Sequence, residues 1–122
     1  MSDLKILFVD DSPTMRRIIQ NSLNKIGYMD LTDAENGVDA LEKIDGQDFD
    51  LIITDWNMPE MNGEQLVIKL RENPQYKDKP ILMITTRGMK EDVITAVKIG
   101  VNGYVVKPFT PEVLKKKISD IL

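Results

Sequence analysis

Three aspartates stand at the ends of two apolar runs in this sequence. Asp10 and Asp11 follow residues 4–9, and Asp55 follows residues 51–54. Ligands of parallel α/β sheets bind beyond the carboxyl ends of the strands, so two neighbouring strands would gather these carboxylates in one cleft. At ~4 Å and an effective dielectric of ~20, each like-charge pair costs about 4 kcal/mol. Protons or a hard divalent cation must neutralise such a cluster, and oxygen ligands with room for water suit Mg²⁺.

Two further polar residues stand at the ends of later apolar runs. Thr85 follows residues 81–84, and Lys107 follows residues 103–106. With the aspartates, these residue types suit transfer of a phosphoryl group to a carboxylate. Asp55 would be the nucleophile, Lys107 a compact cation for the transferring group, and Thr85 a hydroxyl donor. Three carboxylates, one Mg²⁺ and one lysine sum to zero charge, and an added phosphoryl group breaks that balance.

The amino-acid composition excludes several classes of function. The 122 residues suffice for one domain with a real core, and the net charge of −4 gives no basic surface for nucleic acid. Cysteine and histidine are absent, which excludes disulfides, thiolate or imidazole metal sites and Ser-His-Asp catalysis. The amino-terminus is too short and acidic for a signal peptide, and no apolar run approaches ~20 residues. We expect a cytoplasmic protein without membrane insertion.

Short apolar runs alternate five times with amphipathic segments. The strands expected are residues 4–9, 28–34, 51–54, 81–84 and 103–106. N-cap signals open three helices at Ser12-Pro13, Asn36 and Thr110-Pro111, and two helices end at Gly27 and Gly100. Further helices carry Leu66, Val67 and Leu70, and Val93, Ile94, Val97 and Ile99.

Strict alternation of strand and helix predicts a parallel sheet with helices on both faces. Residues 51–54 and 81–84 are continuously apolar, so we place them inside the sheet. Residues 28–34 alternate between apolar and polar side chains, and residues 103–106 form only a short run. We therefore expect these two strands at the edges of the sheet. The order 2-1-3-4-5 of a flavodoxin-like α/β fold satisfies these conditions and puts the acidic cleft where the winding direction reverses. We expect one domain over residues 1–122.

Four motifs together carry a family resemblance. They are VDDS at residues 9–12, DWNMPEMNG at 55–63, MITT at 83–86 and GYVVKPF at 103–109. With them the whole chain resembles the receiver domains of two-component response regulators, in particular those of chemotaxis. The resemblance implies that Asp55 is phosphorylated. It also implies that Asp11, Asp55 and the backbone carbonyl of Asn57 bind Mg²⁺, with Asp10 in the outer part of the site.

The resemblance also assigns the residues that respond to phosphorylation. Thr85 and Lys107 resemble the residues that sense the phosphoryl group, and Tyr104 resembles an aromatic residue that changes rotamer when Thr85 moves. The Lys107-Pro108 peptide bond is expected to be cis. Two positions depart from the family pattern: Thr86 replaces a smaller residue, and Arg87 replaces an acidic or neutral one. Both departures bear on phosphoryl lifetime and partner fit.

The implied function is that of a single-domain regulator rather than an enzyme. A histidine kinase on a separate chain would donate the phosphoryl group. The flagellar motor switch protein would then bind the face formed by the fourth helix, the fifth strand and the fifth helix. A phosphatase is a further expected partner, and we expect a monomer.

The sequence is also compatible with other functions. One is a stand-alone phosphorelay or phosphate-sink receiver that does not act on the motor. Another is a Mg²⁺-dependent aspartyl-phosphate phosphatase, but such enzymes need a general acid two positions after the nucleophile, where this chain has Asn57. An FMN-binding module would place a phosphate against Asp10-Asp11, which would repel it. A pure interaction domain would accept no phosphate.

Overall fold

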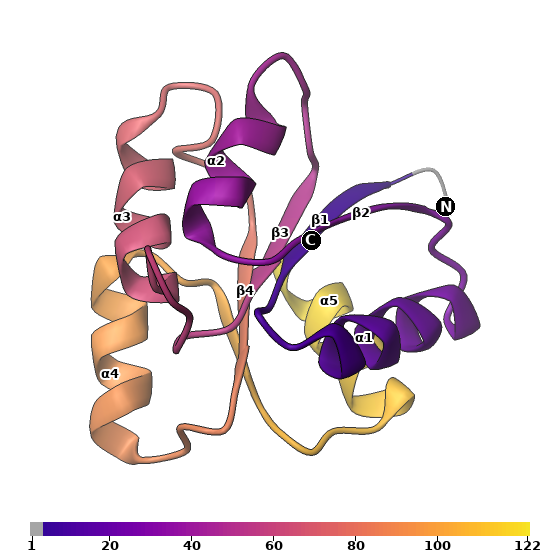
Figure 1. Cartoon of the computed structure of the whole chain (residues 1–122). Helices are drawn as coiled ribbons and strands as arrows, with labels where there is room; N and C mark the ends of the chain where they lie inside the picture. The colour runs from indigo at the N-terminus through magenta and orange to yellow at the C-terminus, as the bar shows by residue number, and fades with distance from the viewer. Residues whose placement is uncertain (1–3) are drawn as a thin grey trace.

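A parallel sheet of five strands lies between two layers of helices in the computed structural model of the chain (Figure 1). The structure describes residues 4–122, so the first three residues of the expected domain lie outside it. The strand order is β2-β1-β3-β4-β5, with every pairing parallel, as predicted. Within the described residues, no helix is long and apolar enough to cross a membrane.

Strands and helices alternate throughout the described chain. The strands are β1 (Lys5–Val9), β2 (Asp30–Ala34), β3 (Leu51–Thr54), β4 (Ile81–Thr85) and β5 (Gly103–Val106). The helices are α1 (Pro13–Lys25), α2 (Gly37–Ile44), α3 (Gly63–Glu72), α4 (Lys90–Ile99) and α5 (Pro111–Ile121).

Three strands differ from the prediction. The first was expected from residue 4, but β1 begins at Lys5. The second was expected from residue 28, but β2 begins at Asp30 because the Tyr28 N–H donates to the Leu23 carbonyl and closes the turn after α1. The expected alternation is also absent, since β2 passes from exposed Asp30 through partly covered residues to buried Ala34. The fourth strand extends one residue beyond its predicted end, to Thr85.

Side chains cap the helices where the sequence indicated. Ser12, Asn36 and Thr110 accept hydrogen bonds from the backbone three residues later, at 3.2, 2.8 and 3.2 Å. One further cap was not predicted from the sequence. Asn62 and Gln65 bond reciprocally at 3.0 and 2.9 Å and form a capping box that opens α3. This box fixes the start of α3, which follows the loop after Asp55; we call that loop the acceptor loop, after the phosphoacceptor role predicted for Asp55.

The sheet has a core on each face because neighbouring side chains of a strand point to opposite sides. Leu7 and Val9 of β1 pack with residues of α2, α3 and α4, and Ile6 and Phe8 pack with residues of α1 and α5. Figure 1 shows α1 and α5 on one side of the sheet and the other three helices opposite. Both faces are covered, which explains the continuously apolar central strands.

Candidate functional site

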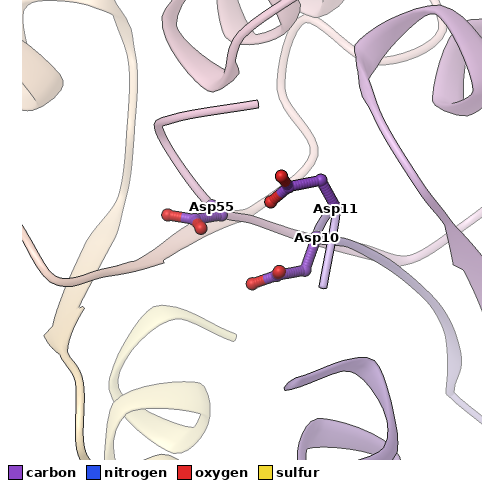
Figure 2. A group of neighbouring side chains, drawn as sticks. All are labelled: Asp10, Asp11 and Asp55. Atoms are coloured by element: carbon purple, nitrogen blue, oxygen red, sulfur yellow. The ribbon is translucent and has the colours of Figure 1, made fainter. Parts of the chain in front are cut away.

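Asp10, Asp11 and Asp55 meet at the carboxyl ends of β1 and β3, as predicted. The two strands pair in parallel with Val9 opposite Thr54, so the residues that follow them emerge at the same edge. One carboxylate oxygen of each aspartate lies within 4.8 Å of the others. Figure 2 shows the three carboxyl groups gathered at this edge.

The three aspartates differ in burial. Asp10 is 1% exposed and Asp55 is 9% exposed, whereas Asp11 is exposed. Asp10 is the most buried of the trio, and its place in the outer part of a metal site stays a prediction. Its Oδ1 accepts a hydrogen bond of 2.9 Å from the Ser12 N–H, which turns the carboxyl group inward. Burial raises the pKa of Asp10, although the hydrogen bond from Lys107 opposes that rise.

Lys107 bridges two of the carboxylates. Its Nζ lies 2.7 Å from Asp10 Oδ2 and 3.1 Å from Asp55 Oδ2, and its side chain is only 10% exposed. Burial alone lowers the pKa of Lys107, but the hydrogen bonds and charges of the two aspartates outweigh burial and hold it above its usual value. The charged ammonium leaves the site with a net charge of −2. Oxygen-only donors with that charge fit Mg²⁺.

Asp55 is held through both carboxylate oxygens. Oδ1 accepts a 2.6 Å hydrogen bond from the Trp56 N–H, and Oδ2 accepts the bond from Lys107. The start of α3 packs directly behind it, since a Cβ at Gly63 would overlap the Asp55 carbonyl. The Gly63 N–H also donates to the Trp56 carbonyl at 2.7 Å. Sequence reasoning missed Gly63, because a glycine after an N-cap carries no local sign of such contact.

Thr85 and Tyr104 contact the same turn after β4. Thr85 is fully buried, and its Oγ1 accepts a 3.3 Å hydrogen bond from the Arg87 N–H. The Tyr104 hydroxyl donates to the Arg87 carbonyl at 2.5 Å. The ring of Tyr104 meets that of Trp56 edge-on, with centroids 6.5 Å apart and planes at 77°. A path of contacts therefore joins the acceptor loop to β5.

Arg87, one of the departures from the family pattern, contacts the residue that follows Asp55. Its guanidinium carbon lies 3.8 Å from the centroid of the Trp56 ring. Its Nη2 pairs with Asp92 Oδ1 at 2.9 Å, which ties the turn to the first helical residues of α4. Asp92 was missed by sequence reasoning, because only the folded turn brings it to Arg87. Contacts of this kind over an indole are worth about 0.5–2 kcal/mol.

The remaining predicted residues lie around this centre. Asn57 follows Trp56 and is exposed, and Thr86 is exposed beside Thr85. The Lys107-Pro108 bond is cis, as the resemblance implied. The metal-binding role of the Asn57 carbonyl stays a prediction.

Known proteins resemble this chain in sequence and in structure. Residues 6–119 match the model of the response regulator receiver domain. Chemotaxis protein CheY1 of Helicobacter pylori is 58% identical over 120 residues, which make up 98% of this chain and 97% of CheY1. The solved structure of chemotaxis protein CheY4 of Vibrio cholerae has a TM-score of 0.92 and 40% identity, covering 98% of this chain and 99% of that one.

A more distant solved structure carries a metal. It is the receiver domain of a sensor histidine kinase from Pseudomonas aeruginosa, with a magnesium ion coordinated in its active-site cleft. It is 25% identical, with a TM-score of 0.88, and the match covers 98% of this chain and 97% of that one.

Proposed function

This chain belongs to the family of response regulator receiver domains and is of the CheY chemotaxis type, and from that premise we propose that it accepts a phosphoryl group on Asp55 and delivers a chemotaxis signal by protein contact. The arrangement that carries the proposal is the acidic trio with Lys107 bridging Asp10 and Asp55.

Magnesium is the proposed cofactor. Asp10, Asp11, Asp55 and the carbonyl of Asn57 would hold it. When bound, it supplies positive charge against the phosphoryl oxygens. The fit rests on oxygen donors within 4.8 Å of one another and on the charge of −2 that Lys107 leaves uncompensated. Without a divalent cation, a dianionic phosphoryl group would approach carboxylates that already repel it.

The proposed transfer is a displacement at phosphorus. A carboxylate oxygen of Asp55 forms the new O–P bond while the N–P bond of a phosphohistidine breaks, and the electron pair of that bond stays on the imidazole nitrogen, which takes up a proton. These 122 residues contain no histidine, and the proposed donor is a histidine kinase. The Lys107 ammonium stabilises the negative charge on the transferring group from its place beside Asp55.

Phosphorylation would then shift an equilibrium between two conformations. The phosphoryl group can bias that equilibrium only through contacts that differ between the states. Thr85 and Lys107 are the proposed contacts, and Tyr104 the residue that repacks. The proposed output face combines α4, β5 and α5, and it exposes apolar side chains that suit a partner such as the flagellar motor switch. These are Ile94, Val97, Val106 and Val113.

We infer that the chain is a regulator rather than a phosphatase. Asn57 stands two positions after Asp55, where an aspartate-based phosphatase needs a general acid. An amide cannot donate a proton to the leaving group, so the phosphoryl-aspartate should persist rather than turn over. The chain would be reset by slow hydrolysis or by a separate phosphatase.

The test is labelling with acetyl phosphate, with and without MgCl₂, measured by intact mass. We expect one phosphoryl group per chain in Mg²⁺, almost none in EDTA, and none for Asp55→Asn in either condition. Asp50→Asn, at a partly exposed aspartate before β3, is the control and should label normally. Label on Asp55→Asn, or many turnovers per chain at steady state, would overturn the proposal.

A further inference from the structure

A groove runs along α2 on the face of the sheet away from α1 and α5. Two adjoining hollows of about 560 and 220 Å³ form it, and both are lined by Val38 and Glu42. Its other wall comes from Met61 in the loop before α3 and from Asn73 at the end of that helix. Figure 1 shows α2 and α3 side by side on this face, and the two helices are in contact. We call this feature the α2/α3 groove.

The floor of the α2/α3 groove is apolar. Val38 is 41% exposed, Leu41 and Met61 are partly exposed, and Ile44 closes the base. Val38, Leu41 and Ile44 form a short apolar stripe along α2, and Met61 of the loop before α3 adds to it. A stripe of that width matches the apolar face of an amphipathic helix, whose contact residues recur at i, i+3, i+4 and i+7.

The rim of the groove carries charge of one sign. Its charged lining residues are Glu35, Asp39, Glu42, Asp45 and Glu60, and no lysine or arginine lines either hollow. The chain as a whole is more balanced, with 16 basic and 20 acidic residues. Apart from Asp39, which pairs with Lys43, none of these carboxylates forms an ion pair or a side-chain hydrogen bond within residues 4–122.

Glu60, on the rim of the groove, has an unusual backbone conformation. It has a φ of 69°, the left-handed region, and it is the one non-glycine residue there within the described chain. That conformation costs roughly 1–2 kcal/mol for most side chains, whereas glycine or asparagine adopts it readily. Strained residues of this kind gather at functional positions. Glu60 therefore adds a carboxylate to the rim from a strained position in the loop before α3.

The groove adjoins the loop that follows Asp55. The Gly37 N–H donates to the Met61 carbonyl at 3.1 Å, and a Cβ at Gly37 would overlap Met61, so the start of α2 lies directly on this loop. The output face proposed above lies on other elements, α4, β5 and α5. An occupant of the groove would therefore contact the acceptor loop and leave that face free.

We propose that the α2/α3 groove is a docking surface for a basic amphipathic helical segment of a partner protein. The apolar stripe receives the apolar face of the segment, and the acidic rim pairs with its lysines or arginines. Nucleic acid, or the acidic groove of a second copy, is disfavoured as the occupant because its negative charge would be repelled by the rim. The proposal does not depend on phosphoryl transfer, and its test uses no phosphodonor.

The test is an NMR titration of the ¹⁵N-labelled full chain with a designed peptide. The probe is an 18-residue helix with leucine at i, i+3, i+4 and i+7 and lysine elsewhere, and its twin carries glutamate in place of every lysine. We expect saturable shifts of residues 37–46 and 60–61 with the lysine peptide, weakened by added NaCl, and no saturable shifts with the twin.

Two matched pairs of variants locate the contact. Glu42→Gln should weaken binding about 1.5- to 5-fold, the range for one exposed ion pair. Val38→Lys should weaken it about tenfold or more, because it adds like charge and removes an apolar contact. The controls are Glu112→Gln on α5 and Ile18→Lys on α1, the latter replacing an isoleucine 43% exposed, and both should bind as the parent does. Circular dichroism verifies folding of each variant.

Several results would overturn the proposal. One is the absence of saturable binding by the lysine peptide, and another is equal binding of the glutamate twin. Shifts centred on α4, β5 and α5 would assign the peptide to the other face. Unchanged affinity of Val38→Lys would remove the groove from the contact. Sedimentation could also show that the chain self-associates with rising concentration and that Glu42→Gln abolishes this. The occupant would then be a second copy of the chain, bound through its Lys115-Lys116-Lys117 run.

Discussion

Replacing Lys107 by methionine should destabilise the fold in a way that depends on pH and magnesium. The substitution keeps much of the side-chain volume and removes the ammonium. It leaves Asp10, 1% exposed, and Asp55, 9% exposed, without the cation that bridges them at 2.7 and 3.1 Å. Removing one partner of a buried ion pair costs about 3–5 kcal/mol, because the remaining charge stays buried and unpaired. We expect about 3 kcal/mol, since Asp55 keeps its bond from Trp56.

The sign of the pH dependence follows from Asp10. Burial raises the pKa of Asp10 in the fold, and Lys107 opposes that rise. A carboxyl group with a raised folded pKa contributes stability at low pH that is lost as the pH rises through the folded value. Without Lys107 the folded pKa of Asp10 should rise further. The stability difference between parent and variant should therefore be large at neutral pH and shrink as the pH falls below that value.

Urea unfolding followed by the fluorescence of Trp56, the single tryptophan, measures the effect. Lys116→Met is the matched control. Lys116 lies 3.4 Å from Asp120 on the surface, with 77% of its side chain exposed, so its loss should cost under about 1 kcal/mol. Saturating MgCl₂ should restore part of the loss in Lys107→Met, because a divalent cation replaces the missing charge and binding to the folded state stabilises it. No such recovery is expected in the control.

Equal destabilisation of Lys107→Met and Lys116→Met would refute the reasoning, since the buried bridge would then carry no more free energy than a surface pair. A deficit that changes with neither pH nor magnesium would also refute it, because it would point to lost packing rather than to uncompensated carboxylates. The double variant Asp10→Asn/Lys107→Met supplies the remaining check. It should be more stable than Lys107→Met alone, because the amide removes the buried charge.

Three other substitutions test separate contacts. Gly63→Ala should lower the free energy of unfolding in urea by at least about 3 kcal/mol, because the added Cβ overlaps the backbone of Asp55. Gly88→Ala is the control and should cost little, because its added Cβ meets only ordinary contacts. Glu60→Asn should raise the free energy of unfolding by about 1 kcal/mol, because asparagine tolerates the φ of 69°; a loss of stability would count against strain at this residue. Arg87→Glu removes the cation over the Trp56 ring. The fluorescence of the indole and the decay rate of the phosphorylated protein should therefore both change. An unchanged decay rate would show that Arg87 has no part in hydrolysis of the phosphoryl group.

The sequence by itself determined the fold class of this protein and the place of its acidic cluster. Apolar runs in alternation with amphipathic segments specify a parallel sheet, and continuous runs such as Leu51–Thr54 specify its central strands. Asp10, Asp11 and Asp55 could be placed together because residues that follow paired parallel strands emerge at one edge. The helix caps could be found because a side-chain acceptor and a backbone donor three residues later form a local unit. The caps and the apolar runs need only short-range information, whereas the meeting of the aspartates also needs the strand order that those runs indicate.

The tertiary structure alone decided how the side chains meet. Lys107 reaches Asp10 and Asp55 across 97 and 52 residues of sequence, and no local pattern says which carboxylates it bridges. Arg87 stacks on Trp56 only because β3 and β4 are neighbours and the turn after β4 folds back over the acceptor loop. Rotamer and burial depend on all the elements packed around a side chain at once, so they follow from the assembled fold rather than from the order of residues.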